Sequence, residues 1–192
     1  MSLVPRSRST DQRYYGVAEA LVTELNDPQK LGRVKVKFPW FDPDMESEWC
    51  RVRQFYAGNA YGAFFIPEVG DEVLVAFIHG DMRLPIILGG LYNGQDKPPS
   101  YHANDKDEKM IRTKGGHRII FDDTSGSEKI SIVDANGDNS IVIDTVANSI
   151  TVKSSKGKLI FEGQGIEIHS GIGIEMKAKA NIDINGLTVN IN

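Results

Sequence analysis

The sequence predicts an all-β protein in which a small barrel precedes a needle of stacked short strands. Residues 165–192 repeat with a period of eight, and apolar and polar residues alternate inside each repeat, as in strands with one buried face. The first hundred residues contain short alternating segments separated by proline and glycine turns. All 8 prolines lie at or before Pro99, so the composition changes there. These observations divide the chain into a barrel and a proline-free, strand-rich second half.

The first half contains about five short strands and no segment that is clearly helical. Residues 15–25 alternate loosely and fit a strand or a helix, whereas residues 32–38 alternate strictly, with Val34, Val36 and Phe38 on one face. Cys50, in the next strand, is interpreted as a small buried core residue. The remaining expectations are strands at 48–55, 73–78 and 85–91, and loops at 42–44 and 57–61. This pattern indicates a small closed barrel.

The second half continues with strands at intervals of about ten residues. Segments 118–121 and 129–133 flank a turn, and Asn136-Gly137 is the strongest hairpin signal in the chain. Further strands are predicted at 149–153 and 158–162, before the repeat tightens to eight residues at Gly165.

The eight-residue repeat has an apolar face that one chain cannot cover. From Ile119 onward no segment keeps an apolar stripe of helical spacing over three turns, so no helix is available as a lid. Identical copies facing one another about an axis would bury this face, which predicts a β-prism or β-helix made by several chains. An ordinary β-sandwich sheet is the alternative. The six residues expected to point inward are Ile166, Ile168, Ile174, Met176, Ile182 and Ile184.

Composition excludes several classes of protein. The chain has 22 basic and 26 acidic residues, and this balance argues against a nucleic-acid partner. A single cysteine excludes an intramolecular disulfide and a cysteine-rich zinc site. No apolar run is long enough for a membrane-spanning helix, and the start of the chain lacks the apolar core of a signal peptide. Leu3 to Arg6 resembles a protease-cleavage linker, so residues 1–12 are interpreted as an expression-tag remnant and tail.

No catalytic, metal or cofactor site is predicted. Asp134 to Asp138 matches the opening of a calcium-binding loop, but Asn139 and Thr145 stand where that loop needs Gly and Glu, so a hairpin turn is preferred. The 4 histidines share no metal-ligand spacing, and the pair Asp122 and Asp123 lacks an acid–base partner. Three aromatic residues, Phe38, Trp40 and Phe55, could be stacking platforms for single-stranded nucleic acid or core residues. The core assignment is preferred because acidic residues follow at once.

Several motifs, in order, resemble the spike proteins of contractile injection machines, namely phage baseplate protein V and the VgrG proteins. The barrel motifs are GRVKVKFPW (32–40), EWCRV (48–52), AGNAYG (57–62), PEVGDEVLVAF (67–77) and GDMRLPIILGGLYNG (80–94). TKGGHRIIFDDTSGSEKISI (113–132) is similar to the segment that opens the spike in VgrG-like proteins. The resemblance implies an OB-fold domain at 13–97, a linker at 98–112 and a trimeric, intertwined β-helix at 113–192.

The resemblance also implies partners and a mechanical role. The expected assembly is a homotrimer, built in the bacterial cytoplasm into a phage tail or similar particle, that leads the tube through a target cell envelope. Because few residues precede the barrel, a separate baseplate hub protein is expected. The end of the chain lacks the histidines of an iron-bound tip, so a PAAR-type tip protein is expected to dock on Leu187, Val189, Ile191 and Asn192. The main rival hypothesis is a monomeric OB-fold module that binds an oligonucleotide or carbohydrate. A third hypothesis, an enzyme, would need a set of catalytic residues, and the sequence offers none.

Overall fold

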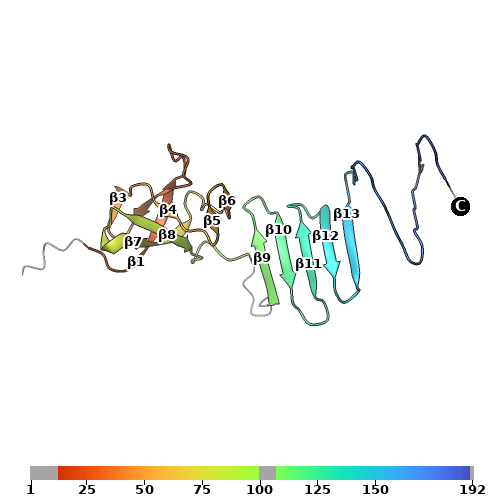
Figure 1. Cartoon of the computed structure of the whole chain (residues 1–192). Helices are drawn as coiled ribbons and strands as arrows, with labels where there is room; N and C mark the ends of the chain where they lie inside the picture. Colours follow the sequence, from red (N-terminus) through yellow and green to blue (C-terminus); the bar gives the residue numbers. More distant parts are fainter. Residues whose placement is uncertain (1–12, 100–106, 191–192) are drawn as a thin grey trace, which may run out of the picture. The chain divides into compact units, whose positions relative to one another are not determined.

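The computed structural model describes residues 13–99 and 107–190, and every regular element in these ranges is a strand except one short 3-10 turn. The chain divides into two compact units between Lys106 and Asp107 (Figure 1). The prediction of an all-β protein is confirmed. Each unit is described by itself below.

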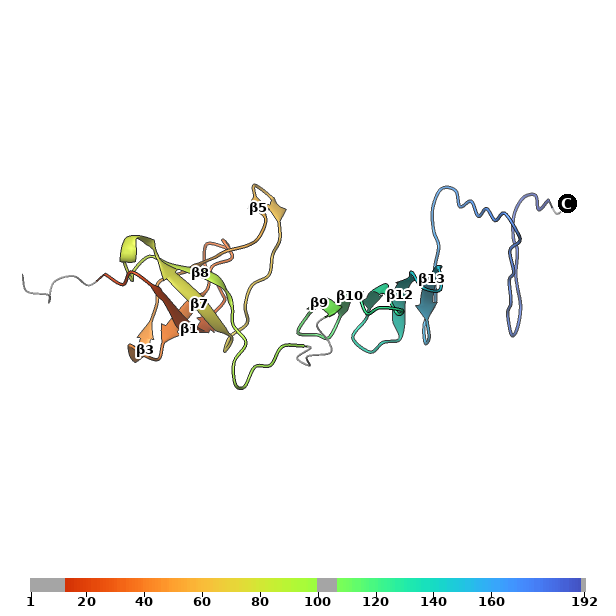
Figure 2. The same ribbon diagram turned by 90° about the horizontal axis from the view of Figure 1, so that it is seen from below.

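The first unit is built on a six-stranded sheet with the order β3-β2-β1-β7-β8-β4. Neighbouring strands are antiparallel except β4 and β8, which are parallel. A two-stranded hairpin, β5–β6, lies outside this sheet (Figure 2). The elements are β1 (Val17–Glu24), β2 (Lys35–Phe38), β3 (Asp42–Glu46), β4 (Arg51–Val52), β5 (Ala57–Gly58), β6 (Tyr61–Gly62), β7 (Glu72–Phe77), the turn η2 (Ile78–Gly80) and β8 (Pro85–Gly90).

One pair of residues closes the sheet on itself. Val34, just before β2, and Cys50, just before β4, exchange two backbone hydrogen bonds, with N–O distances of 3.1 Å and 2.7 Å. Since β4 also pairs with β8, the strands β1, β2, β4, β8 and β7 form a continuous ring. The predicted closed barrel therefore rests on a bridge outside the named strands.

The interior of the barrel follows directly from the alternation in the sequence. In β1, β2 and β7 every second side chain points inward, because successive residues of a strand face opposite sides of the sheet. Cys50 is fully buried, as predicted. The core consists of Ala18, Ala20, Val22, Val34, Val36, Phe38, Cys50, Val73, Val75, Phe77 and Ile87.

Two loop predictions in this unit were wrong. Residues 42–44, expected to begin a loop, lie in the edge strand β3, which pairs with β2 and adds an ion pair of 2.7 Å between Lys35 and Glu46. Residues 57–61, expected to form a loop, contain most of the hairpin β5–β6. The long strand expected at 48–55 shrinks to Arg51–Val52, because only these two residues pair with β8.

Two of the three aromatic residues assigned to the core are on the surface. Phe38 is buried, but Trp40 is 48% exposed and Phe55 is 76% exposed. Trp40 lies past the end of β2, where its ring contacts Tyr14 and its Nε1 donates to the carbonyl of Glu19 at 3.1 Å. Phe55 follows the short β4 and rests against Phe65. Both residues lie where strand pairing has ended, so the alternation that buries Phe38 no longer applies.

The second unit is a five-stranded antiparallel meander in which each strand pairs with the next along the chain. Its strands are β9 (Glu108–Arg112), β10 (Arg118–Asp122), β11 (Lys129–Val133), β12 (Asn139–Asp144) and β13 (Ser149–Ser154). β9 occupies residues that the sequence analysis placed in the linker. The Asn136-Gly137 turn is present, with Gly137 at a φ of 75° and its N–H bonded to the carbonyl of Asp134.

The strands predicted beyond β13 are absent from the single chain. Residues 155–190 contain no assigned strand, and their side chains are exposed. A strand needs a neighbour for its backbone N–H and C=O groups, and within this segment the chain provides none.

Candidate interaction surface on the second unit

One face of the β9–β13 meander carries two parallel rows of apolar side chains. The strand registers align residues across the sheet, since each strand pairs directly with the next. The first row is Ile111, Ile119, Ile132, Ile141 and Val152; the second is Phe121, Ile130, Ile143 and Ile150. These nine residues are called the apolar face below.

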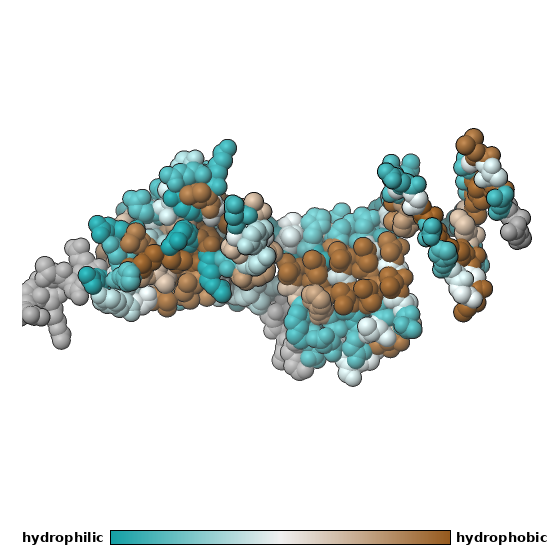
Figure 3. All heavy atoms as spheres, viewed as in Figure 1, coloured by the Kyte–Doolittle hydropathy of each residue, from teal (hydrophilic) through white to brown (hydrophobic). Residues whose placement is uncertain are grey.

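The apolar face is open to solvent in the single chain. Its side chains are between 39% and 72% exposed, and they form two continuous bands on the surface (Figure 3). Contiguous exposed apolar patches of this kind mark interaction surfaces, because leaving them in water is unfavourable. Fully burying one such side chain contributes roughly 1.5–3 kcal/mol, so covering what remains exposed on each contributes roughly half of that.

The opposite face of the meander has a different composition. Its middle row mixes apolar and hydroxyl side chains, and ionisable residues dominate the rows on either side. Here Met110, Ile120 and Val142 are partly covered, in contrast to the apolar face. The two faces therefore differ in composition, as in an antiparallel sheet that buries one face and leaves the other in water.

A shallow pocket lies over the first row of the apolar face. Ile119, Ile132 and Ile141 line its floor, and Leu159, which follows β13, contributes to its wall. His117 and Lys158 lie at its margin. Polar and aliphatic residues both line this pocket, but the surface that it exposes is chiefly apolar, so it is suited to another apolar surface.

The carboxylates singled out by the sequence serve the turns. Asp122 accepts a hydrogen bond from the backbone N–H of Thr124 at 3.0 Å, and the hydrogen bonds from Thr124 lower the pKa of Asp122. Asp134 accepts from the N–H and the side-chain amide of Asn139 at 3.2 Å and 2.7 Å. Both carboxylates hold hairpin geometry, as Asx-type turn residues do.

The described residues contain no candidate metal site. Among residues 13–99 and 107–190, no group of three or more His, Cys, Asp or Glu side chains is placed to hold an ion. The same ranges contain no helix long and apolar enough to cross a membrane.

The single chain does not bring the six predicted inward residues of the eight-residue repeat together. Ile166, Ile174 and Ile182 are 50–57% exposed, and Ile168, Met176 and Ile184 are more exposed still. Of the residues expected to seat a tip protein, Leu187 is fully exposed and Val189 is half exposed. Ile191 and Asn192 lie outside the described residues. The roles of these ten residues remain predictions.

The apolar face was not predicted from the sequence, although a signal for it is present there. Pairs of large apolar residues separated by one position recur at 119/121, 130/132, 141/143 and 150/152. The four strands that contain these pairs were predicted, whereas β9 was not, and their common face becomes visible only when the register aligns the pairs. Because the eight-residue period is more regular, the buried face was predicted at residues 166–184 instead.

The fold and this surface define a class: a chain with a small β-barrel followed by a strand meander whose apolar face is uncovered. Comparison with known proteins specifies the class. Residues 18–92 match the family described as the type VI secretion system/phage-baseplate injector OB domain. The first unit is therefore similar to this OB domain, and the match supports a likeness of the chain to VgrG-like baseplate spike proteins.

Named relatives agree with this assignment. The type VI secretion system spike protein VgrG3 of Vibrio cholerae is 40% identical over 109 residues, which are 52% of this chain and 11% of that protein. The corresponding spike protein VgrG1a of Pseudomonas aeruginosa is 36% identical over 128 residues, or 60% of this chain and 20% of that protein. The actin cross-linking toxin VgrG1 of Vibrio cholerae is 38% identical over 108 residues, 10% of its length. The aligned parts are thus a small fraction of each relative.

Proposed function

We propose that this protein is the central spike of a contractile injection system, and that it acts mechanically rather than as an enzyme. In this proposal three copies assemble through their apolar faces into a rod that leads the tube through the envelope of a target cell. The observation that carries the proposal is the uncovered apolar face, nine large side chains on a sheet that no element of its own unit covers. Relatives named as type VI secretion spike proteins support it.

The eight-residue repeat extends the same arrangement toward the end of the chain. Residues 166–184 repeat an apolar alternation but form no strand alone, and strands supplied by neighbouring copies would satisfy their backbone groups. We infer that this segment winds with its counterparts into a trimeric β-helix. Association would then bury its six aliphatic and Met side chains on the axis.

The proposed partners occupy the two ends of such a rod. A baseplate hub protein would hold the OB domains, and a PAAR-type tip would dock on Leu187, Val189, Ile191 and Asn192. The similarity to type VI secretion spike proteins supports assembly in the bacterial cytoplasm into a phage-tail-like particle. Neither a nucleic acid nor a cofactor is required for this role.

An exposed aspartate on the apolar face tests the proposal. Ile132 is 50% exposed in the single chain, so Ile132→Asp should leave the monomer folded but place a charge in the proposed interface. Light scattering of the wild type should give a mass near three chains, and the variant should shift to one chain. Thr151→Asp, on the opposite face of the same sheet, is the matched control and should stay assembled. A wild type that remains a single chain at all concentrations would refute the proposed spike.

A further inference from the structure

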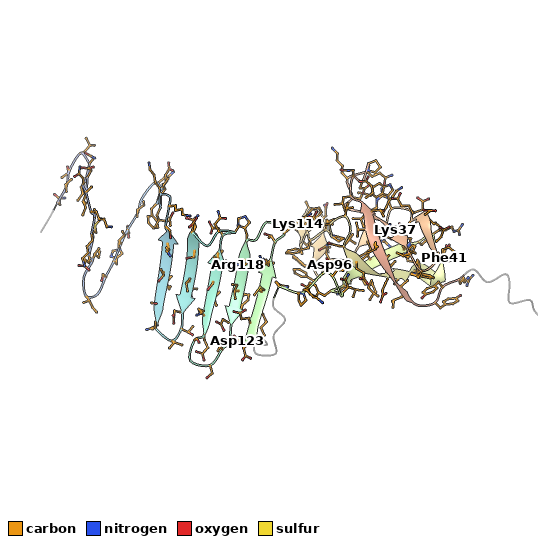
Figure 4. The ribbon with its side chains drawn as sticks, turned by 180° about the vertical axis from the view of Figure 1, so that it is seen from behind. Lys37, Phe41, Asp96, Lys114, Arg118 and Asp123 are labelled. Carbon is orange, nitrogen blue, oxygen red and sulfur yellow. The ribbon has the colours of Figure 1, made fainter. Side chains whose placement is uncertain are left out.

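The two ends of the strands in the meander carry opposite net charge. At one end, segments 112–118, 133–139 and 153–158 form what we call the basic edge, with six basic residues against two acidic ones. At the other, segments 107–109, 122–129 and 144–149 form the acidic edge, with six acidic residues against two basic ones. Lys114 and Asp123 mark the opposite ends (Figure 4). The majority residues are Arg112, Lys114, Arg118, Lys153, Lys156 and Lys158 on the basic edge, and Asp107, Glu108, Asp122, Asp123, Glu128 and Asp144 on the acidic edge.

Ion pairs inside the chain do not remove this polarity. On the basic edge, the minority residue Asp138 pairs with Lys156 at 3.0 Å. On the acidic edge, Lys109 pairs with Asp123 at 3.2 Å, and Lys129 lies 4.0 Å from Asp122. Each of these three pairs joins opposite charges of the same edge, so it leaves the net charge of that edge unchanged.

Opposite edges restrict how copies of the sheet can cover one another. Consider an axis that runs across the strands, in the direction from β9 to β13. Copies related by rotation about this axis all run from β9 to β13 in the same direction. The basic edge of each copy then meets the acidic edge of the next. If two sheets cover one another while pointing in opposite directions, basic meets basic and acidic meets acidic. Like charges placed together disfavour that contact, whereas complementary edges favour the first.

We propose that the charged edges fix the direction of assembly: neighbouring copies lie parallel, with the basic edge of one against the acidic edge of the next. This inference rests on the proposed spike and adds the feature that selects its symmetry. Burial of the apolar face supplies most of the free energy of association. It does not favour one relative orientation of two sheets over the other, because both of its rows are rich in aliphatic residues. The contact between edges is heterologous, and it closes into a ring when rotation brings the last copy back to the first.

Charge reversal on one edge tests the pairing. The variant Lys114→Glu/Lys153→Glu/Lys158→Glu makes both edges acidic, and Glu108→Lys/Asp123→Lys/Glu128→Lys makes both basic. Each should raise the apparent dissociation constant of the full-length assembly at least about tenfold at low salt, because like charges then meet at every contact. Combining all six changes exchanges the two edges and should restore assembly to near the wild-type level. Lys30→Glu/Arg51→Glu/Lys97→Glu in the first unit, with the same change of net charge, is the control.

Salt gives a second readout of the same contact. Charges at the edges are screened over about 10 Å at 0.1 M ionic strength, so added salt should weaken the wild type and strengthen the single-edge variants. Equal dissociation constants for wild type and both single-edge variants at low salt would overturn the edge pairing.

Cross-linking reports the direction directly. Ser125→Cys places a thiol on the acidic edge and Asn136→Cys places one on the basic edge, both in exposed turns. With a short bismaleimide, the double variant should join into covalent trimers, whereas either single variant should not cross-link. Cross-linking of both single variants would show that like edges meet and would overturn the proposal.

The outcomes separate this inference from the function on which it rests. If the wild type does not assemble, both the proposed spike and the proposed edge pairing are refuted. If the wild type assembles and charge reversal on one edge changes neither the mass nor the stability of the assembly, the proposed spike stands and only the edge pairing is refuted.

Discussion

At the scale of single residues, Asp27 organises the connection between β1 and β2. Its carboxylate accepts hydrogen bonds from the backbone N–H groups of Gln29 and Leu31, and it forms a 2.7 Å ion pair with Arg33. Only 3% of its side chain is exposed. The Arg33 guanidinium, with these N–H groups, holds the pKa of Asp27 well below its usual range. The loop therefore depends on an ionised carboxylate.

Asp27→Asn should lower the melting temperature of the barrel in a pH-dependent way. Because the folded state lowers the pKa, the stabilisation by the charge is present above the unfolded pKa and is lost as pH falls through the folded pKa. Variant and wild type should differ by several degrees near pH 7 and converge as the solution is made strongly acidic. Thermal melts followed by circular dichroism across this range measure the difference. Asp44→Asn, which changes an exposed carboxyl on β3, is the control and should leave the melting temperature at pH 7 close to that of the wild type.

At the scale of elements, the same alternation has different outcomes in different segments. β2 alternates over four residues and lies in a closed ring, so its inward residues are fully buried. β10 to β13 also carry large apolar residues at every second position, yet these side chains stay in water because the sheet has only one layer. Residues 166–184 alternate as well, but they have no neighbour and form no strand. An alternating segment thus specifies a face, and its neighbours decide whether that face is buried.

Ile174→Asp tests the assignment of the eight-residue repeat. In a trimeric β-helix this change removes roughly 1.5–3 kcal/mol of burial from each copy and places three carboxylates near one axis. Limited proteolysis with mass spectrometry should show faster cleavage within residues 165–190, while the mass of the assembly is retained through the apolar face of β9–β13. Lys177→Asp, in the polar column formed by His169, Lys177 and Asn185 of the repeat, is the control. Unchanged resistance of Ile174→Asp would show that Ile174 does not point inward.

At the scale of the whole molecule, the two units differ in what stabilises them. The OB domain has a complete core of eleven buried residues within one chain. In the second unit, none of the described residues is buried, and its large apolar residues lie on an open face. The OB domain is therefore expected to fold alone, whereas the second unit is expected to gain most of its stability from association.

Thermal unfolding at several protein concentrations should separate these two contributions. The transition of the second unit should move to higher temperature as concentration rises, because association stabilises only the assembled form. The transition of residues 13–99 should stay constant. Tryptophan fluorescence isolates the OB domain, since Trp40 and Trp49 are both in it. Two transitions that are both independent of concentration would contradict this division.

The sequence by itself determined the class of fold, the positions of several strands and the resemblance to baseplate spike proteins. Strict alternation at Val34, Val36 and Phe38 is a local property, and so is the turn chemistry of Asn136-Gly137. The tertiary structure decided what depends on pairing: the Val34–Cys50 bridge that closes the barrel, the strand β3, the exposure of Trp40 and Phe55, and the alignment of the apolar face. Local periodicity tells which way a side chain points from its own strand, whereas register and closure depend on contacts between residues far apart in sequence.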